Sequence, residues 1–403
     1  MDGVETKPVL VGVLGAGKWW NVYYQMGENR VSTNYATHAL KKFLEDSGMR
    51  FSEVVLFGTS GSNWSLADYL IKNYRRVIVP EGRDESELKE TYTIFFEELS
   101  HHKSIVLDLT HAFRHLSQLL LIVAYYLDLL GTTRIEGIYY ALLPEPKEGA
   151  SSTIVNLKPL LTSLRTLFNV ESFRETLKVS GLNSILKDLE LYARQATSRK
   201  EKELFSRIGS ILKALRTLGV YVSVNYTPQI VSQSINISEM AKQLIGTVSK
   251  NYPYILPSLN VLIHETDELA SFENHPLWFA QLQLAKKCLK LGRYTSAIIN
   301  LREGFLTYTC HELSDCKEKN YCEKQTNCKS HETREKVSKL LFEIRDNKNM
   351  PEPHIKYAKT FDKIAQLRNN IVHGYMGRKN APKTNLEEEI NKLLEEASKL
   401  AKI

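Results

Sequence analysis

The sequence predicts an α/β fold in the N-terminal third of the chain and an all-α fold in the remainder. Up to about residue 143, short apolar runs rich in Val, Ile and Leu alternate with helical patterns. From about residue 160 onward the pattern is mainly helical and charged. Alternation of buried strands with helices is typical of βαβ units and of a parallel sheet with helices on both faces.

The N-terminal pattern predicts a doubly wound, Rossmann-like sheet. Its expected strands are 9–14 (VLVGVL), 53–58 (EVVLFG), 76–80 (RVIVP), 104–109 (SIVLDL) and 135–143 (IEGIYYALL), and its expected helices are 34–46, 63–73, 85–101 and 111–130. Thr110 is placed to cap the last of these helices, and Gly131 is placed to end it.

Three segments that follow expected strands have the composition of binding turns: GAGKWW (15–20), GTSGSNW (58–64) and DLTHAFRH (108–115). In doubly wound sheets, ligands bind outside the carboxyl ends of the strands. Backbone amides, hydroxyls, Lys18, His111 and Arg114 at helix N-termini suit phosphodiester groups. Trp19, Trp20 and Trp64 are expected either to stack on bases or to belong to the core.

Two nucleotide-binding motifs fail in the first turn. A dinucleotide fingerprint needs a third glycine where Trp20 stands, and an indole prevents the close helix packing that glycine permits. A P-loop from Gly12 to Lys18 has Trp19 in place of the Ser or Thr that holds magnesium. We therefore expect neither a dehydrogenase nor an NTPase.

The middle of the chain is expected to be a helical connector, as in segment 184–219. Segment 220–237 (VYVSVNYTPQIVSQSINI) has no charged residue and several β-branched residues, which allows either a hairpin or a buried contact. Farther on, two antiparallel helices are expected to join at Gly292, and a later helix begins near Pro353 and stops at Gly374.

The end of this last helix reads LRNNIVHG (367–374). Phe361, Ile364, Ala365, Ile371 and Val372 form an apolar stripe with Arg368 in its middle, and Asp362, Gln366, Asn369 and His373 form the neighbouring polar stripe. An arginine in an apolar stripe needs a buried acidic partner or a cleft shared with another surface. The alternative is a surface helix whose arginine snorkels and whose histidine favours the helix C-terminus.

Two of these motifs together resemble a known family. DLTHAFRH resembles the motif of the CRISPR-associated Rossmann-fold (CARF) ligand-binding domains, and RNNIVH resembles the Arg-x4-to-6-His motif of HEPN ribonucleases. Their order resembles that of the ancillary ribonucleases of type III CRISPR systems. The resemblance implies a CARF domain at 1–160, a mainly helical connector at 161–265 and a helical HEPN domain at 266–403.

The resemblance also implies a homodimer or higher homo-oligomer whose CARF domains bind cyclic oligoadenylate, which activates a composite HEPN site. By position after the strands, the implied ligand-binding residues are Gly15, Lys18, Thr59, Ser60, Asn63, Thr110, His111 and Arg114. Family motifs commonly have glycine where this chain has Ala112.

The implied nuclease residues are Arg368, Asn369 and His373. Cleavage of single-stranded RNA requires activation of a ribose 2′-hydroxyl and protonation of the leaving oxygen, which a histidine can perform, while an arginine stabilises charge on the phosphate. This chemistry needs no metal, and we expect no cofactor besides the activator. The alternatives are a non-catalytic sensor that signals to a partner protein and a CARF domain that also degrades its own ligand.

The cysteines are unevenly distributed. Cys310, Cys316, Cys322 and Cys328 recur at equal spacing in a polar insert (307–335), whereas Cys288 lies apart and is expected to be a buried thiol. The insert could hold two disulfides, reduced thiols or a zinc ion with His311 and His331, although the C-x-x-C pairs of usual zinc sites are missing. Disulfides are the favoured prediction.

Composition sets the broad class. The chain has 403 residues, 43% of them hydrophobic, with a formal charge of +7, which fits a globular protein and allows a polyanionic partner such as RNA. The longest apolar run, 116–130, contains Ser117, Gln118 and Asp128 and is too short and too polar to cross a bilayer. The N-terminus resembles no export signal, so a cytoplasmic location and no membrane partner are expected.

Overall fold

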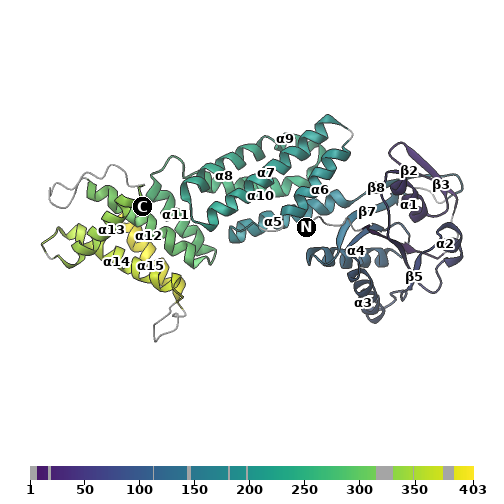
Figure 1. Ribbon diagram of the computed structural model, residues 1–403, viewed down its shortest axis with the longest axis horizontal. Helices are drawn as coiled ribbons and strands as arrows, with labels where there is room; N and C mark the ends of the chain where they lie inside the picture. Colours follow the sequence, from purple (N-terminus) through teal and green to yellow (C-terminus); the bar gives the residue numbers. More distant parts are fainter. Residues whose placement is uncertain are drawn as a thin grey trace. The chain divides into compact units, whose positions relative to one another are not determined.

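The computed structural model describes residues 7–16, 20–111, 113–142, 147–179, 182–196, 198–314, 330–347, 349–374 and 385–403. The chain divides into two compact units, Met1–Leu161 and Thr162–Ile403 (Figure 1). The boundary between the units lies one residue from the predicted end of the α/β domain. A further division near residue 265 stays a prediction.

The first unit is built on one mixed sheet of eight strands. The strands are β1 (Val9–Leu14), β2 (Val22–Met26), β3 (Asn29–Thr33), β4 (Glu53–Gly58), β5 (Arg75–Ile78), β6 (Ser104–Asp108), β7 (Arg134–Leu142) and β8 (Ser151–Asn156). Their order is β3-β2-β8-β7-β6-β1-β4-β5. The five predicted strands form the parallel run β7-β6-β1-β4-β5, which confirms the doubly wound core.

Three strands were not predicted. β2 and β3 form an antiparallel hairpin whose turn holds Gly27 at φ +61°, and β8 pairs with both β2 and β7. Within the hairpin, β2 alternates buried and exposed residues, with Val22 and Tyr24 turned into the core, and β3 is mostly exposed. This alternation differs from the continuous apolar runs of the central strands, which are buried on both faces.

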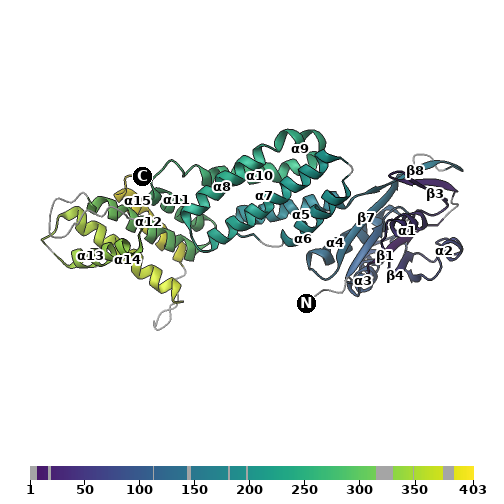
Figure 2. The same cartoon turned by 45° about the horizontal axis from the view of Figure 1, so that its top comes forward.

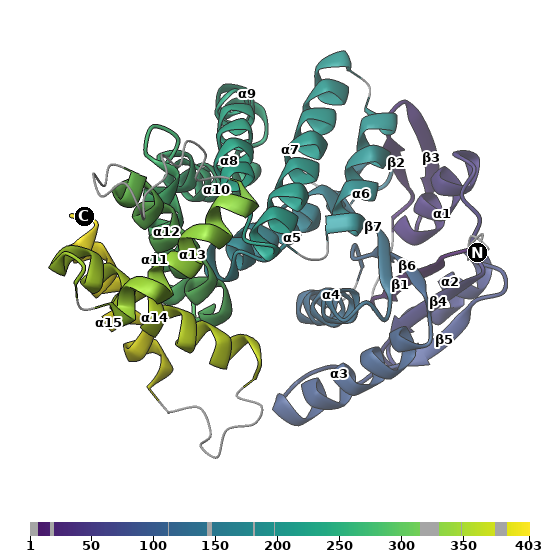
Figure 3. The same cartoon turned by 60° about the vertical axis from the view of Figure 1, so that its left-hand side comes forward.

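Helices cover both faces of the sheet. α1 (Ala36–Asp46) and α2 (Trp64–Leu70) pack on one face, and α3 (Glu85–Ser100) and α4 (Arg114–Leu129) pack on the other (Figures 1 and 3). Gly131, at φ +72°, follows the end of α4 as predicted. The predicted cap is wrong, because α4 begins after Phe113 and its first turn receives no side-chain cap.

The described part of the second unit is helical. Its elements are α5 (Lys158–Thr176, which starts in the first unit), α6 (Leu182–Gln195), α7 (Arg199–Ser223), α8 (Thr227–Lys242), α9 (Ile245–Asn251), η1 (Pro253–Ile255), α10 (Leu256–Ala270), α11 (Leu277–Lys290), α12 (Tyr294–Ser314), α13 (His331–Asp346), α14 (Glu352–Val372) and α15 (Leu386–Leu400). α7, α8 and α10 run side by side (Figure 2). Gly292, at φ +67°, joins α11 and α12 as predicted.

The hairpin alternative for segment 220–237 is wrong. The segment contains the end of α7, a turn with Asn225 at φ +56°, and most of α8. Ile230, Val231 and Ile237 are buried, which confirms the alternative of a buried contact. The segment therefore lacks charge because it is packed among helices, and its β-branched residues do not specify a strand.

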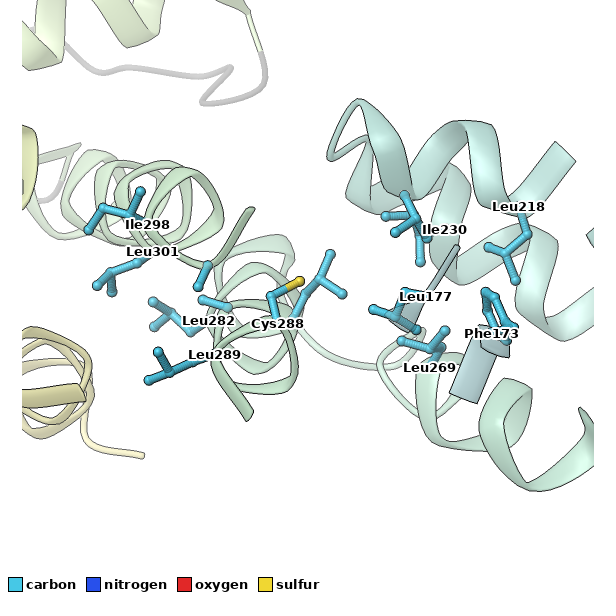
Figure 4. Packing of buried hydrophobic residues seen from close by; sticks show 14 of the residues in the cluster. Phe173, Leu177, Leu218, Ile230, Leu269, Leu282, Cys288, Leu289, Ile298 and Leu301 are labelled. Atoms are coloured by element: carbon cyan, nitrogen blue, oxygen red, sulfur yellow. The ribbon is translucent and has the colours of Figure 1, made fainter. Parts of the chain in front are cut away.

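A continuous hydrophobic core runs through the second unit. Figure 4 shows Leu282, Cys288 and Leu289 of α11 beside Ile298 and Leu301 of α12. Phe173, Leu218, Ile230 and Leu269 belong to the same core. Cys288 is a free, buried thiol, as predicted, and burial raises its pKa to about 11. Such a cysteine acts as a packing residue.

Candidate functional site

The three predicted binding turns meet at one edge of the sheet. β6, β1 and β4 are parallel neighbours, so the turns that follow them lie at their common carboxyl ends. Two hydrogen bonds join the second turn to the end of β1 and to the first turn. Ser62 Oγ donates to the carbonyl oxygen of Leu14 at 2.6 Å, and the backbone amide of Asn63 donates to the carbonyl oxygen of Gly15 at 3.0 Å. This edge is the candidate ligand site.

In the second turn, several predicted residues bond to their own chain. The Asn63 side chain caps α2, because its Oδ1 accepts from the amide of Leu66 at 3.3 Å. Thr59 is buried, and its amide donates to Ser62 Oγ at 2.9 Å. Ser60 is exposed at the tip of the turn. Of these three predicted contacts, the Ser60 side chain is the most accessible.

The two described tryptophans of these turns differ in burial. Trp64 is buried in the sheet core, and its indole N–H donates to the carbonyl oxygen of Thr59 at 3.0 Å. Trp20 is 43% exposed and lies at the end of the first turn. Lys18 and Trp19 lie outside the described residues. Trp20 is therefore available for stacking, whereas Trp64 is a core residue.

The third turn is organised around Asp108, a buried carboxylate that sequence reasoning did not select. Its Oδ1 accepts from the amide of Thr110 at 3.0 Å and from the Thr110 hydroxyl. Its Oδ2 accepts from Thr37 Oγ1 at 2.6 Å. Burial raises the pKa of Asp108, while the bonds from Thr110 and Thr37 lower it. The signal for this residue was an acid inside the apolar run SIVLDL.

Thr110 and His111 also bond within the fold. The Thr110 hydroxyl accepts from the amide of Ala141 in β7 at 2.9 Å. His111 Nε2 accepts from the amide of Ala36 at 3.1 Å, and its ring lies 5.4 Å from that of Tyr35. Arg114 is exposed at the first position of α4. Of the predicted residues in this turn, Arg114 is the one most open to a ligand.

Burial lowers the pKa of His111 to about 3. Since the unfolded chain binds this proton near pH 6.5, the stability that neutral His111 contributes is complete above that pH and decreases as the pH falls toward 3. We expect urea unfolding of wild type between about pH 7 and about pH 4 to show this loss. His111→Gln keeps an acceptor for Ala36 and should show a smaller loss.

The raised pKa of Asp108 has the opposite effect on the free energy of unfolding. The stability that Asp108 contributes is complete below the ordinary carboxyl range and is lost as the pH rises through the pKa of Asp108 in the folded protein. Asp108 is present in both proteins, so the difference between wild type and His111→Gln isolates the histidine. Equal pH dependence of the two proteins would contradict a neutral, half-buried His111.

The candidate nuclease residues lie at the C-terminal end of α14. Arg368 is half-buried, and its Nη1 donates to Asn369 Oδ1 at 2.9 Å. Asn369 and His373 are exposed, one turn apart, and the His373 amide donates to the Asn369 carbonyl oxygen at 3.0 Å. Gly374 follows at φ +59°, which confirms the predicted stop.

The apolar stripe around Arg368 is shorter than predicted. Phe361, Ile364 and Ala365 are buried, but Val372 is 39% exposed. Val372 is therefore not a core residue of the single chain. A half-buried Arg368 at this place fits both remaining alternatives, an arginine that snorkels to solvent and one that lies in a cleft shared with another surface.

The neighbouring polar stripe is anchored at its beginning. Asp362 pairs with Arg345 of α13 at 3.0 Å and accepts from Gln366 Nε2 at 2.8 Å. Asn369 and His373 continue this stripe toward the exposed end. Hydrogen bonding to Asp346 and Asp362 raises the pKa of Arg345. Arg345 thus pairs with the carboxylates of Asp346 and Asp362, whereas Arg368 donates to the neutral side-chain amide of Asn369.

No family model matches the chain. The chain is 20% identical over 325 residues to "CRISPR-associated protein MJ1674" of Methanocaldococcus jannaschii, a match that covers 78% of this chain. The chain is a relative of a CRISPR-associated protein. The predicted resemblance to CRISPR-associated proteins is thereby confirmed. The match spans 45% of that relative, less than half of its length.

A solved structure is also similar to this chain. It is that of Enterococcus italicus Csm6 bound to cyclic hexa-2′-fluoro-hexa-dAMP, with a TM-score of 0.41 and 12% identity. The similarity covers 98% of this chain and 93% of that chain.

Cys310 is disulfide-bonded, whereas Cys316, Cys322 and Cys328 lie outside the described residues, so their pairing stays a prediction. In the described ranges no cluster of three His, Cys, Asp or Glu side chains could hold a metal. A cavity of about 600 Å³ lined by Thr227, His275 and His311 lies apart from the predicted site residues.

None of the helices in the described part of the chain has the length and apolarity that a bilayer crossing needs.

Proposed function

We propose that this protein is a cyclic-oligoadenylate-activated, metal-independent endoribonuclease that cleaves single-stranded RNA in type III CRISPR defence. The observation that carries the proposal is the C-terminal end of α14, whose last turns hold the half-buried Arg368 and the exposed Asn369 and His373. The meeting of three polar turns at the sheet edge and the likeness to a CRISPR-associated protein support it.

The proposed reaction is transesterification within RNA. The ribose 2′-oxygen forms a bond to phosphorus, and the bond from phosphorus to the 5′-oxygen breaks, which leaves a cyclic phosphate and a 5′-hydroxyl. His373 moves the proton between these oxygens, and Arg368 stabilises the negative charge on the phosphate. Asn369 Oδ1, which accepts from Arg368, holds the guanidinium beside the histidine turn.

A single α14 helix does not direct Arg368 and His373 toward a common point. On a straight helix, residues five apart diverge by roughly 140° at about 100° per residue. A second copy of α14 can supply the missing group, so that the Arg368 of one chain faces the RNA together with the His373 of its partner. The half-buried Arg368 beside the exposed Val372 supports such a shared surface.

In the first unit, the proposed activator lies across the three strand-end turns. Its phosphates are bound by Lys18, by Arg114 and by backbone amides of the turns, and Ser60 donates a further hydrogen bond. Gly15 allows close approach of the ligand. Thr59, Asn63, Thr110 and His111, whose polar atoms bond within the fold, shape the turns that present these groups.

The direct test is RNA cleavage in EDTA. Full-length protein is incubated with labelled single-stranded RNA and, separately, with cyclic tetra- and hexaadenylate. We expect cleavage that requires one of these rings, does not depend on divalent metal, and leaves a cyclic phosphate end. Ring binding without cleavage of any RNA would instead favour a non-catalytic sensor.

The homodimer is supported by an apolar stripe on α4. Ile122, Tyr126 and Leu129 recur on one face of this helix and are 59%, 46% and 54% exposed. We expect Ile122→Glu to lower the mass measured by light scattering to that of one chain and to abolish RNA cleavage. Since Ile122 is exposed, the variant should fold normally.

Thr93 provides the matched control for this variant. It is exposed on α3, so Thr93→Glu adds the same charge to a neighbouring helix of the same unit. This variant should keep the wild-type mass and activity. A monomeric wild-type protein, or a dimeric Ile122→Glu protein, would contradict the assignment of α4 to the interface.

A further inference from the structure

Asp108 joins α1 to the third binding turn through its two carboxylate oxygens. Oδ2 accepts from Thr37 Oγ1 at 2.6 Å, and Oδ1 accepts from the Thr110 amide at 3.0 Å. Asp108 is 2% exposed and Thr37 is fully buried. A carboxylate removed from water needs every one of these donors, because each unpaired oxygen costs free energy.

Gly12 creates the space for this contact. It is the β1 register partner of Asp108 on β6. A Cβ atom at Gly12 would lie 2.9 Å from both Thr37 Oγ1 and Thr37 Cγ2, closer than side chains tolerate. Thr37 therefore reaches the carboxylate only because β1 has no side chain at this position.

A second contact holds the same turn to the same helix end. The amide of Ala36 donates to His111 Nε2 at 3.1 Å. Tyr35, just before α1, is fully buried and its hydroxyl donates to the Val13 carbonyl oxygen at 3.4 Å. Residues 35–37 thus connect the start of α1 to β1, to Asp108 and to His111.

We propose that Thr37 and Asp108 are positioning residues of the activator site, which fix the turn at 110–111 without touching the ligand. This inference rests on the proposed function of that edge. When the Thr37 hydroxyl is absent, a buried carboxylate oxygen loses its donor, and the turn shifts to find water or another donor. The groups that the turn presents, including Arg114 at the start of α4, then lose their alignment.

The test compares three variants of the full-length chain. Thr37→Val removes the hydroxyl at constant shape, Thr37→Ser restores it, and Thr91→Val is the matched control, since Thr91 is fully buried on α3 and its hydroxyl bonds only the Glu87 carbonyl oxygen of the same helix. We expect Thr37→Val to weaken binding of labelled cyclic tetra- or hexaadenylate about tenfold or more. Thr37→Ser and Thr91→Val should bind within about threefold of wild type.

A second readout separates positioning from general destabilisation. The Thr110 amide, which donates to Asp108, should exchange its hydrogen faster in Thr37→Val than in wild type, while amides of β4 and α3 keep their wild-type rates. Equal affinity of Thr37→Val and wild type would overturn the inference. If wild type binds neither ring, the proposed function itself fails.

Discussion

Replacement of His373 by alanine is expected to abolish RNA cleavage while activator binding stays at its wild-type level. The imidazole is the proposed proton carrier, and loss of a general acid or base lowers the rate by about 10²- to 10⁴-fold. His373 is exposed beyond the last turn of α14, so its removal leaves the core unchanged. The measurement is single-turnover cleavage of labelled RNA, together with activator affinity and the melting temperature.

His264 is a suitable control for this variant. Its side chain is 78% exposed on α10, and His264→Ala should cleave RNA at the wild-type rate. Arg368→Lys keeps the charge but loses the planar fork that binds a phosphate through two bonds, so it should also lose most activity. Full activity of His373→Ala would refute the assignment of the α14 end as the active site.

A second large effect is expected from Gly12→Val. The new side chain would collide with Thr37 and with Leu56 Cδ2, which lies 3.0 Å from the position of a Cβ atom. Overpacking of this kind costs about 1–3 kcal/mol. The variant should destabilise the first unit and also lose activator binding, since α1 can no longer approach Asp108. Hydrogen exchange of β1 and β6 amides measures the first effect, and ring affinity measures the second.

Gly209 allows a matched comparison. It lies inside α7, and apart from its chain neighbours and the backbone of its own helix no atom of the described residues lies within 4 Å of a Cβ built there. Gly209→Ala should therefore leave binding unchanged and stabilise its helix by about 0.5–1 kcal/mol. Normal stability and normal affinity in Gly12→Val would contradict the close contact between Gly12 and Thr37.

The central strands could be predicted because strands buried on both faces read as continuous apolar runs. β2 and β3 escaped prediction because they lie at the margin of the sheet, where half of their side chains meet solvent. Segment 220–237 was open to two interpretations because a short uncharged run has the same composition in a buried helix and in a strand. Its α8 residues are helical because they pack on α7 and α10.

The meeting of the three polar turns at one edge of the sheet could also be predicted, since topology brings the ends of parallel neighbours together. The role of each side chain at this edge could not be predicted. Thr110 and Asn63 have polar side chains that could bind a ligand, but in the fold Thr110 donates to Asp108 and Asn63 accepts from Leu66. Asp108 and Thr37 are 71 positions apart, so no local pattern shows that they meet. The proposed pairing of Arg368 with His373 likewise involves a second chain, which no pattern within one sequence shows.

The packing of the Thr37 side chain between Gly12 and Asp108 has a consequence for protein design. The segment DLTHAFRH looks like a portable recognition loop, because its polar residues are contiguous. Its shape, however, is set by a hydroxyl on α1 and by the missing side chain on β1, both encoded far upstream. Grafting this loop onto another parallel sheet should succeed only when the glycine and the threonine are transferred with it, as a discontinuous set of three segments.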